Sequence, residues 1–186
     1  MGDVETLVRI VLSQRPTLLT LAVVSLVLVP LVTVLAIRAG WSWWRVASAG
    51  GAGLGTALVV AVTLGRSEDG VVLHGWDLHC LTKPGLSLHT PEAKLNLLLF
   101  GPACFFAVLA LRRLVIVCVL ATVLSVLLEA LQGATGVGTC ETSDVVRNVA
   151  GAVVAGLLGF VAVMATARLP QHRPDRRRPR ASVTVP

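Results

Sequence analysis

Charged and aromatic residues are scarce in this chain. Of its 186 residues only 14% are charged and 4% are aromatic, and tyrosine is absent altogether. A soluble domain usually carries about 25% charged residues. This shortage, together with 55% hydrophobic residues and a mean hydropathy of +0.82, excludes an ordinary water-soluble fold. The composition instead predicts a protein that is largely surrounded by lipid.

Cysteine is also sparse, and its spacing excludes several kinds of site. The chain has four cysteines and no CxxC pair, so neither a disulfide-rich scaffold nor a zinc ribbon or dithiol redox centre is predicted. His79 stands beside Cys80, but this spacing matches no known zinc motif. We therefore expect no metal and no cofactor.

Five hydrophobic runs approach the length that a membrane helix needs. A helix that crosses a hydrocarbon core of about 30 Å takes about 20 apolar residues. Pro30 and the Gly101-Pro102 pair interrupt two of the runs, which membrane helices tolerate because neighbouring groups satisfy the freed carbonyls. The pattern predicts an all-α, polytopic transmembrane helix bundle with about five spans. The runs are Thr17–Ile37, Val46–Leu64, Leu95–Leu111, Leu114–Leu131 and Val149–Ala167.

Two segments flank the predicted transmembrane domain of residues 17–167. In residues 1–16, the stretch Val4–Leu12 has apolar residues at helical spacing with charges between them, which predicts an amphipathic segment along the interface. Residues 168–186 are rich in proline and contain six arginines. This composition predicts a disordered basic tail. Its charge favours contact with anionic membrane lipids rather than with nucleic acid.

The distribution of lysine and arginine predicts the orientation. With five spans, ten of the 16 basic residues fall on the side of the tail and six on the side of the N-terminus. Because cytoplasmic segments carry the excess of basic residues, we expect the tail on the cytoplasmic side of the membrane. Cys80 and Cys140 then share the oxidising outer side. A disulfide between them is allowed, and two unpaired thiols are the alternative.

Polar residues collect near the outer ends of the last three predicted spans. Glu129 lies close to the end of the fourth span, where an ionisable group costs a few kcal/mol unless it faces protein or water. Ser125 and Gln132 share its helical face. The third span begins with Asn96, and the fifth opens with Asp144, Arg147 and Asn148.

Small residues continue the polar face of the fifth span. Gly151, Ala155 and Gly159 recur at every fourth position, a pattern that lets two membrane helices approach closely. We therefore expect the fifth helix to pack on the fourth, with its polar residues near Glu129 and Gln132.

Two interpretations of the polar residues remain open. In the first, Glu129 and Arg147 form an ion pair and the amides form hydrogen bonds between helices, so that the cluster only holds the bundle together. In the second, the residues line an outward-facing pocket for a lipid-linked head group or small ligand. Catalysis is a weaker third possibility, because no nucleophile has an evident base beside it. The candidate pocket residues are Asn96, Ser125, Glu129, Gln132, Asp144, Arg147 and Asn148.

Three motifs in the chain resemble those of the VanZ-like membrane proteins. They are NLLLFGPACF at Asn96–Phe105, SVLLEALQ at Ser125–Gln132 and SDVVRNVAGAVVAGLLG at Ser143–Gly159. The resemblance covers residues 92–160 and preserves the spacing within each motif. Cys104 stands where the family usually has glycine, and Gly138 stands where many members have arginine.

The resemblance implies a bacterial integral membrane protein with an accessory role similar to that in teicoplanin-type glycopeptide resistance. Its ligand would belong to the cell envelope, such as a lipid-linked envelope precursor. Two alternatives stand beside this one. The chain could be a noncatalytic assembly or scaffold protein whose polar cluster is structural, or an intramembrane lipid-modifying enzyme.

Overall fold

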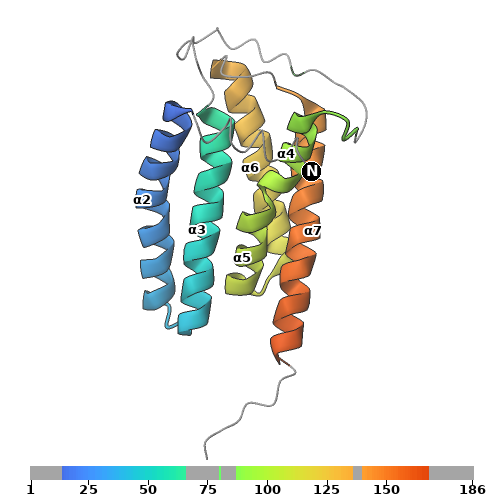
Figure 1. Cartoon of the computed structure of the whole chain (residues 1–186). Helices are drawn as coiled ribbons and strands as arrows, with labels where there is room; N and C mark the ends of the chain where they lie inside the picture. The colour runs from blue at the N-terminus through green and yellow to red at the C-terminus, as the bar shows by residue number, and fades with distance from the viewer. Residues whose placement is uncertain (1–13, 66–79, 81–86, 136–139, 168–186) are drawn as a thin grey trace, which may run out of the picture.

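The computed structural model of the chain describes residues 14–65, 80, 87–135 and 140–167. These residues form six helices and no strand. The helices lie side by side in an up-and-down bundle (Figure 1). They are α2 (Arg15–Arg38), α3 (Trp43–Leu64), α4 (Pro91–Leu99), α5 (Gly101–Leu111), α6 (Leu114–Thr135) and α7 (Thr142–Ala167).

The prediction of an all-α bundle with about five spans is confirmed. Helices α2, α3, α6 and α7 are each long and apolar enough to cross a membrane, and α4 and α5 together form the remaining span. A helix of 22 residues such as α6 is about 33 Å long, which matches a hydrocarbon core of about 30 Å. The chain is therefore a multi-pass membrane protein by architecture.

The third span starts earlier than its hydrophobic run suggests. Helix α4 begins at Pro91 because the Oγ1 atom of Thr90 accepts a hydrogen bond from the backbone N–H of Ala93, at 3.3 Å. Such a capping bond satisfies one of the free donors at a helix start. Phe100 separates α4 from α5, next to the Gly101-Pro102 pair. In α2, by contrast, Pro30 lies inside an uninterrupted helix.

The fifth span also starts earlier, at Thr142. Its polar residues therefore lie on the first turns of α7, as we expected. Thr142 and Ser143 are both already helical. Ser143 donates from its hydroxyl to the Glu141 carboxylate, at 3.3 Å.

The small residues of α7 lie against the third span. A side-chain carbon added at Gly151 would overlap the backbone carbonyl of Leu97 in α4, and one added at Gly159 would lie 2.8 Å from the carbonyl oxygen of Phe105 in α5. We expected these residues to face the fourth span. Helix α7 does contact α6, but through Asn148 and Gly156. The expected packing of α7 on α6 is therefore present, and the small residues add a close contact with the third span.

The bundle has two chemically different ends. At the first, which we call the polar end, α2 and α4 begin, α3 ends, α6 ends and α7 begins (Figure 1). At the opposite end, which we call the arginine end, lie the turn between α2 and α3 and the turn between α5 and α6. The amphipathic stretch, the basic tail and most of the loop after α3, with His74, His79 and Trp76, lie outside the described residues.

Candidate functional site

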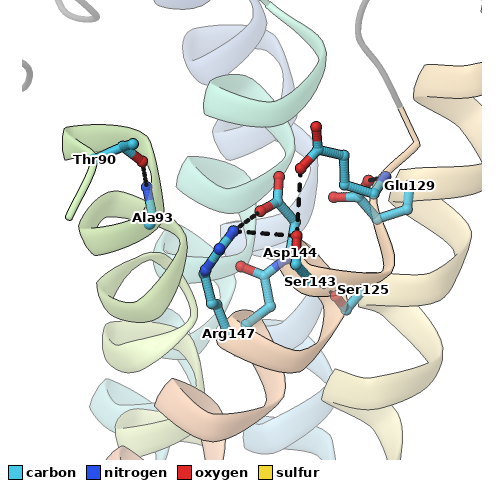
Figure 2. Close-up of polar contacts among 9 residues, drawn as sticks. Thr90, Ala93, Ser125, Glu129, Ser143, Asp144 and Arg147 are labelled. Atoms are coloured by element: carbon cyan, nitrogen blue, oxygen red, sulfur yellow. Dashed lines mark hydrogen bonds and ion pairs between the residues drawn. The ribbon is translucent and has the colours of Figure 1, made fainter. Parts of the chain in front are cut away.

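A polar cluster at the end of α6 and the start of α7 is the candidate site (Figure 2). Figure 2 shows its side chains turned toward one another between α4 and α6. Four of its residues, Ser125, Glu129, Ser143 and Asn148, are almost fully buried although they are polar. The polar cluster consists of Ser125, Glu129, Glu141, Ser143, Asp144, Arg147 and Asn148.

Glu129 binds the backbone at the start of α7. Its side chain is 5% exposed, and its Oε2 atom accepts a hydrogen bond from the backbone N–H of Glu141, at 3.1 Å. A buried carboxylate needs such a donor, because desolvation without a partner costs several kcal/mol. Glu129 therefore connects the end of α6 to the start of α7.

Arg147 is held by residues of its own helix. Its NH1 atom donates to Asp144 Oδ1 at 2.5 Å and to Ser143 Oγ at 3.3 Å, and its side chain is 12% exposed. We considered an ion pair between Glu129 and Arg147. The structure shows Asp144 as the carboxylate that pairs with Arg147, and no ion pair between Arg147 and Glu129 within the described residues. The helical spacing of three residues explains this choice, since it places Asp144 on the neighbouring turn.

Asn148 joins α7 to the middle of α6. Its Nδ2 atom donates to Ser125 Oγ at 3.1 Å, and both residues are at most 6% exposed. The second polar atom of this side chain, Asn148 Oδ1, is buried without a hydrogen-bond partner, and so is the Nε atom of Arg147. Since buried polar atoms in proteins are normally paired, these two atoms require explanation.

Two of the predicted pocket residues lie outside the polar cluster. Gln132 points to α3, where its Nε2 atom donates to the carbonyl oxygen of Thr63 at 3.1 Å. Asn96 is partly buried in α4, and no hydrogen bond joins it to the cluster within the described part of the chain. The other five predicted residues do come together, so the site contains fewer of the predicted residues than we expected.

Glu141 and Ser143 belong to the cluster but were not among the predicted site residues. Glu141 contributes through its backbone N–H as well as its carboxylate, and a backbone donor leaves no signal in the residue type. A usable signal was present for Ser143, since serine at the start of a helix commonly bonds a nearby polar group.

A disulfide lies directly beside the cluster. The sulfur atoms of Cys80 and Cys140 are bonded across a sequence separation of 60 residues, and Cys140 is adjacent to Glu141. The loop after α3 is thus covalently attached where Glu129 receives its hydrogen bond. Cys104 and Cys118 are free thiols within the spans. Within the described ranges, no three histidine, cysteine or acidic residues are placed to hold a metal ion.

No family model, curated protein or solved structure matches this chain. The resemblance to the VanZ-like proteins consequently rests on the three motifs alone and stays a prediction. The geometry of the polar cluster is therefore the main basis for interpreting the site.

Proposed function

We propose that this multi-pass membrane protein is VanZ-like and binds the polar head group of a lipid-linked envelope ligand at the polar cluster. The observation that carries the proposal is the pair of buried, unpartnered atoms, Arg147 Nε and Asn148 Oδ1. Ionisable and polar groups inside a membrane are costly, and where they persist they commonly serve a binding or transport role.

The two free atoms define the chemistry of the ligand. Arg147 Nε is a donor on a cation, whereas Asn148 Oδ1 is a neutral acceptor. A fully ionised phosphate only accepts hydrogen bonds, so it satisfies Arg147 but not Asn148. Hydroxyl groups and amides both donate and accept. A head group that contains sugar or peptide units therefore fits the cluster better than a simple phosphate does.

The position of the cluster supports a ligand from the outer leaflet. The cluster lies in the half of the bundle nearer the polar end, where α6 ends and α7 begins. In the orientation that the basic residues predict, this end faces the cell exterior. A lipid-linked envelope precursor presents its sugar and peptide units on that side.

A second candidate function, noncatalytic assembly, has its own supporting observation. The cluster's hydrogen bonds connect its members to one another and join α6 to α7. Ordered water satisfies isolated buried atoms in many proteins. On this view the cluster only fixes the helices, and loss of function in variants follows loss of folded protein.

A matched pair of amide variants separates the two candidates. Asn148→Leu removes the free acceptor, whereas Gln132→Leu removes an amide that bonds Thr63 outside the cluster. Both variants lose one hydrogen bond between helices, which costs about 0.6–2 kcal/mol. We expect a bacterium that expresses the chain to lose protection against teicoplanin with Asn148→Leu and to keep it with Gln132→Leu, at equal protein abundance.

Three results would count against the proposal. If both variants lose protection in proportion to their abundance, the cluster is structural. If Glu129→Gln and Asp144→Asn fold normally and keep full protection, the polar cluster does not carry the function. If the wild-type chain gives no protection, the resistance-like role is wrong, and lipid binding must be measured directly.

A further inference from the structure

An apolar cavity lies at the arginine end, far from the polar cluster. Its volume is about 350 Å³, and it lies between α2, α3 and the end of α5. Alanines of all three helices form much of its wall, among them Ala36, Ala52 and Ala110, and Trp41 closes one side. Pockets that bind small molecules and cofactors have volumes of about 300–1,000 Å³, so the cavity is large enough for part of a ligand.

Arg45 is attached to the wall of this cavity at two points. Its Nε atom donates to the carbonyl oxygen of Ala110 at 2.8 Å, and its guanidinium lies 4.2 Å from the centre of the Trp41 ring. The two terminal nitrogens of Arg45 make no hydrogen bond to any residue that the structure describes. The guanidinium is thus fixed in place with most of its donors still available.

The surroundings of Arg45 are uniformly basic. Arg38, Arg112 and Arg113 are exposed at the same end, at the turn between α2 and α3 and the turn between α5 and α6. The carboxylates of the described residues all lie at the polar end; they are Glu92, Glu129, Glu141 and Asp144. The charge at the arginine end is therefore positive without local compensation in the part of the chain that is described.

We propose that the cavity holds an acyl chain of a phospholipid with an anionic head group, whose phosphate binds the terminal nitrogens of Arg45. An acyl chain gains little by leaving the bilayer for an apolar cavity, since lipid tails are as apolar as the cavity wall. Selectivity must therefore come from the head group. A guanidinium matches a phosphate with parallel N–H donors, and each nearby arginine adds attraction for anionic lipid.

The site is separate from the polar cluster and does not depend on the function proposed for it. It lies at the opposite end of the bundle, and it requires an anionic phosphate rather than a sugar or peptide head group. A variant at one site is therefore expected to leave the other unchanged.

Trp41 provides a local reporter for the test. In the full chain, Trp43→Phe, Trp44→Phe and Trp76→Phe leave Trp41 as the only tryptophan. Trp43 is 81% exposed, so its replacement removes little packing. The protein is reconstituted in membranes of ordinary phosphatidylcholine that contain an increasing mole fraction of a second lipid with brominated acyl chains. This second lipid is either brominated phosphatidylglycerol or brominated phosphatidylcholine. We expect brominated phosphatidylglycerol to quench Trp41 at a fraction at least about fivefold lower than brominated phosphatidylcholine.

Arginine variants test the head-group contact. Arg45→Gln is expected to reduce the preference for phosphatidylglycerol about fivefold while quenching by brominated phosphatidylcholine persists. Arg15→Gln is the control, because Arg15 begins α2 at the polar end. If Arg45→Gln fails to fold, the double variant Arg38→Gln and Arg112→Gln is used to test the preference for the anionic head group. Neither of these two side chains bonds a described residue.

Alanine variants test entry of the acyl chain into the cavity. Ala52→Leu fills part of the cavity, and we expect it to weaken quenching of Trp41 by both brominated lipids. Ala47→Leu is the matched control, since Ala47 is exposed on the same helix. Equal quenching by the two lipids in the wild type, a preference that survives loss of the arginines, or quenching unchanged by Ala52→Leu would each overturn the proposal.

Discussion

Gly151→Ala tests the close approach of α4 and α7 that positions the polar cluster. An added methyl group at this position would overlap the backbone carbonyl of Leu97. Because a carbonyl cannot rotate away as a side chain can, one helix must shift as a whole. Overpacking costs about 1–3 kcal/mol, and an overlap with backbone falls at the upper end. Alanine recovers about 1 kcal/mol of helix propensity over glycine, which leaves a net loss of about 2 kcal/mol.

The loss is measurable as a lower melting temperature of the purified protein in detergent. For a chain of this length, 1 kcal/mol corresponds to about 2–4 °C, so we expect Gly151→Ala to melt about 4–8 °C below the wild type. Gly50→Ala is the matched control, since the nearest atom to its added carbon is Thr33 Oγ1 at 3.4 Å. If the two variants melt at the same temperature, α4 and α7 do not approach at Gly151.

Three further outcomes follow from the same contacts. Ser125→Ala leaves the buried Nδ2 of Asn148 without its acceptor, and a loss of about 1 kcal/mol is expected in the same melting assay; no loss would exclude this bond. Reductant or Cys80→Ser should lower the melting temperature, because a disulfide across 60 residues lowers the entropy of the unfolded chain and so stabilises the fold by about 4 kcal/mol. Cys118→Ser should leave the melting temperature unchanged. In intact cells, a membrane-impermeant maleimide should label Cys80 and Cys140 only after reduction; labelling only after permeabilisation would reverse the orientation.

The spans could be predicted from the sequence because lipid imposes one simple requirement. Each crossing helix needs an apolar stretch of nearly fixed length, and all five stretches form helices. The helix starts were less predictable. The starts at Pro91 and Thr142 lie in polar sequence, where capping and backbone hydrogen bonds decide the boundary and hydropathy does not.

The site was predicted only in part, for a similar reason. Helical spacing placed Ser125, Glu129 and Asn148 on inward faces, and all three are buried. Spacing does not tell which neighbour a face meets. Gln132 shares the face of Glu129 and has a side chain of the same length, yet it bonds a carbonyl of α3. Glu129 bonds a backbone N–H, a donor that every residue type except proline provides.

Direct lipid binding tests the central claim, that the polar cluster holds a head group rather than only joining helices. The measurement is native mass spectrometry of the full chain in detergent with a polyprenyl diphosphate lipid that carries sugar and peptide units, and with polyprenyl phosphate for comparison. We expect the wild type and Gln132→Leu to bind the sugar-bearing lipid alike and Asn148→Leu to bind it about tenfold more weakly, because one buried hydrogen bond is lost. Equal binding by all three proteins, or equal binding of the two lipids by the wild type, would contradict the claim.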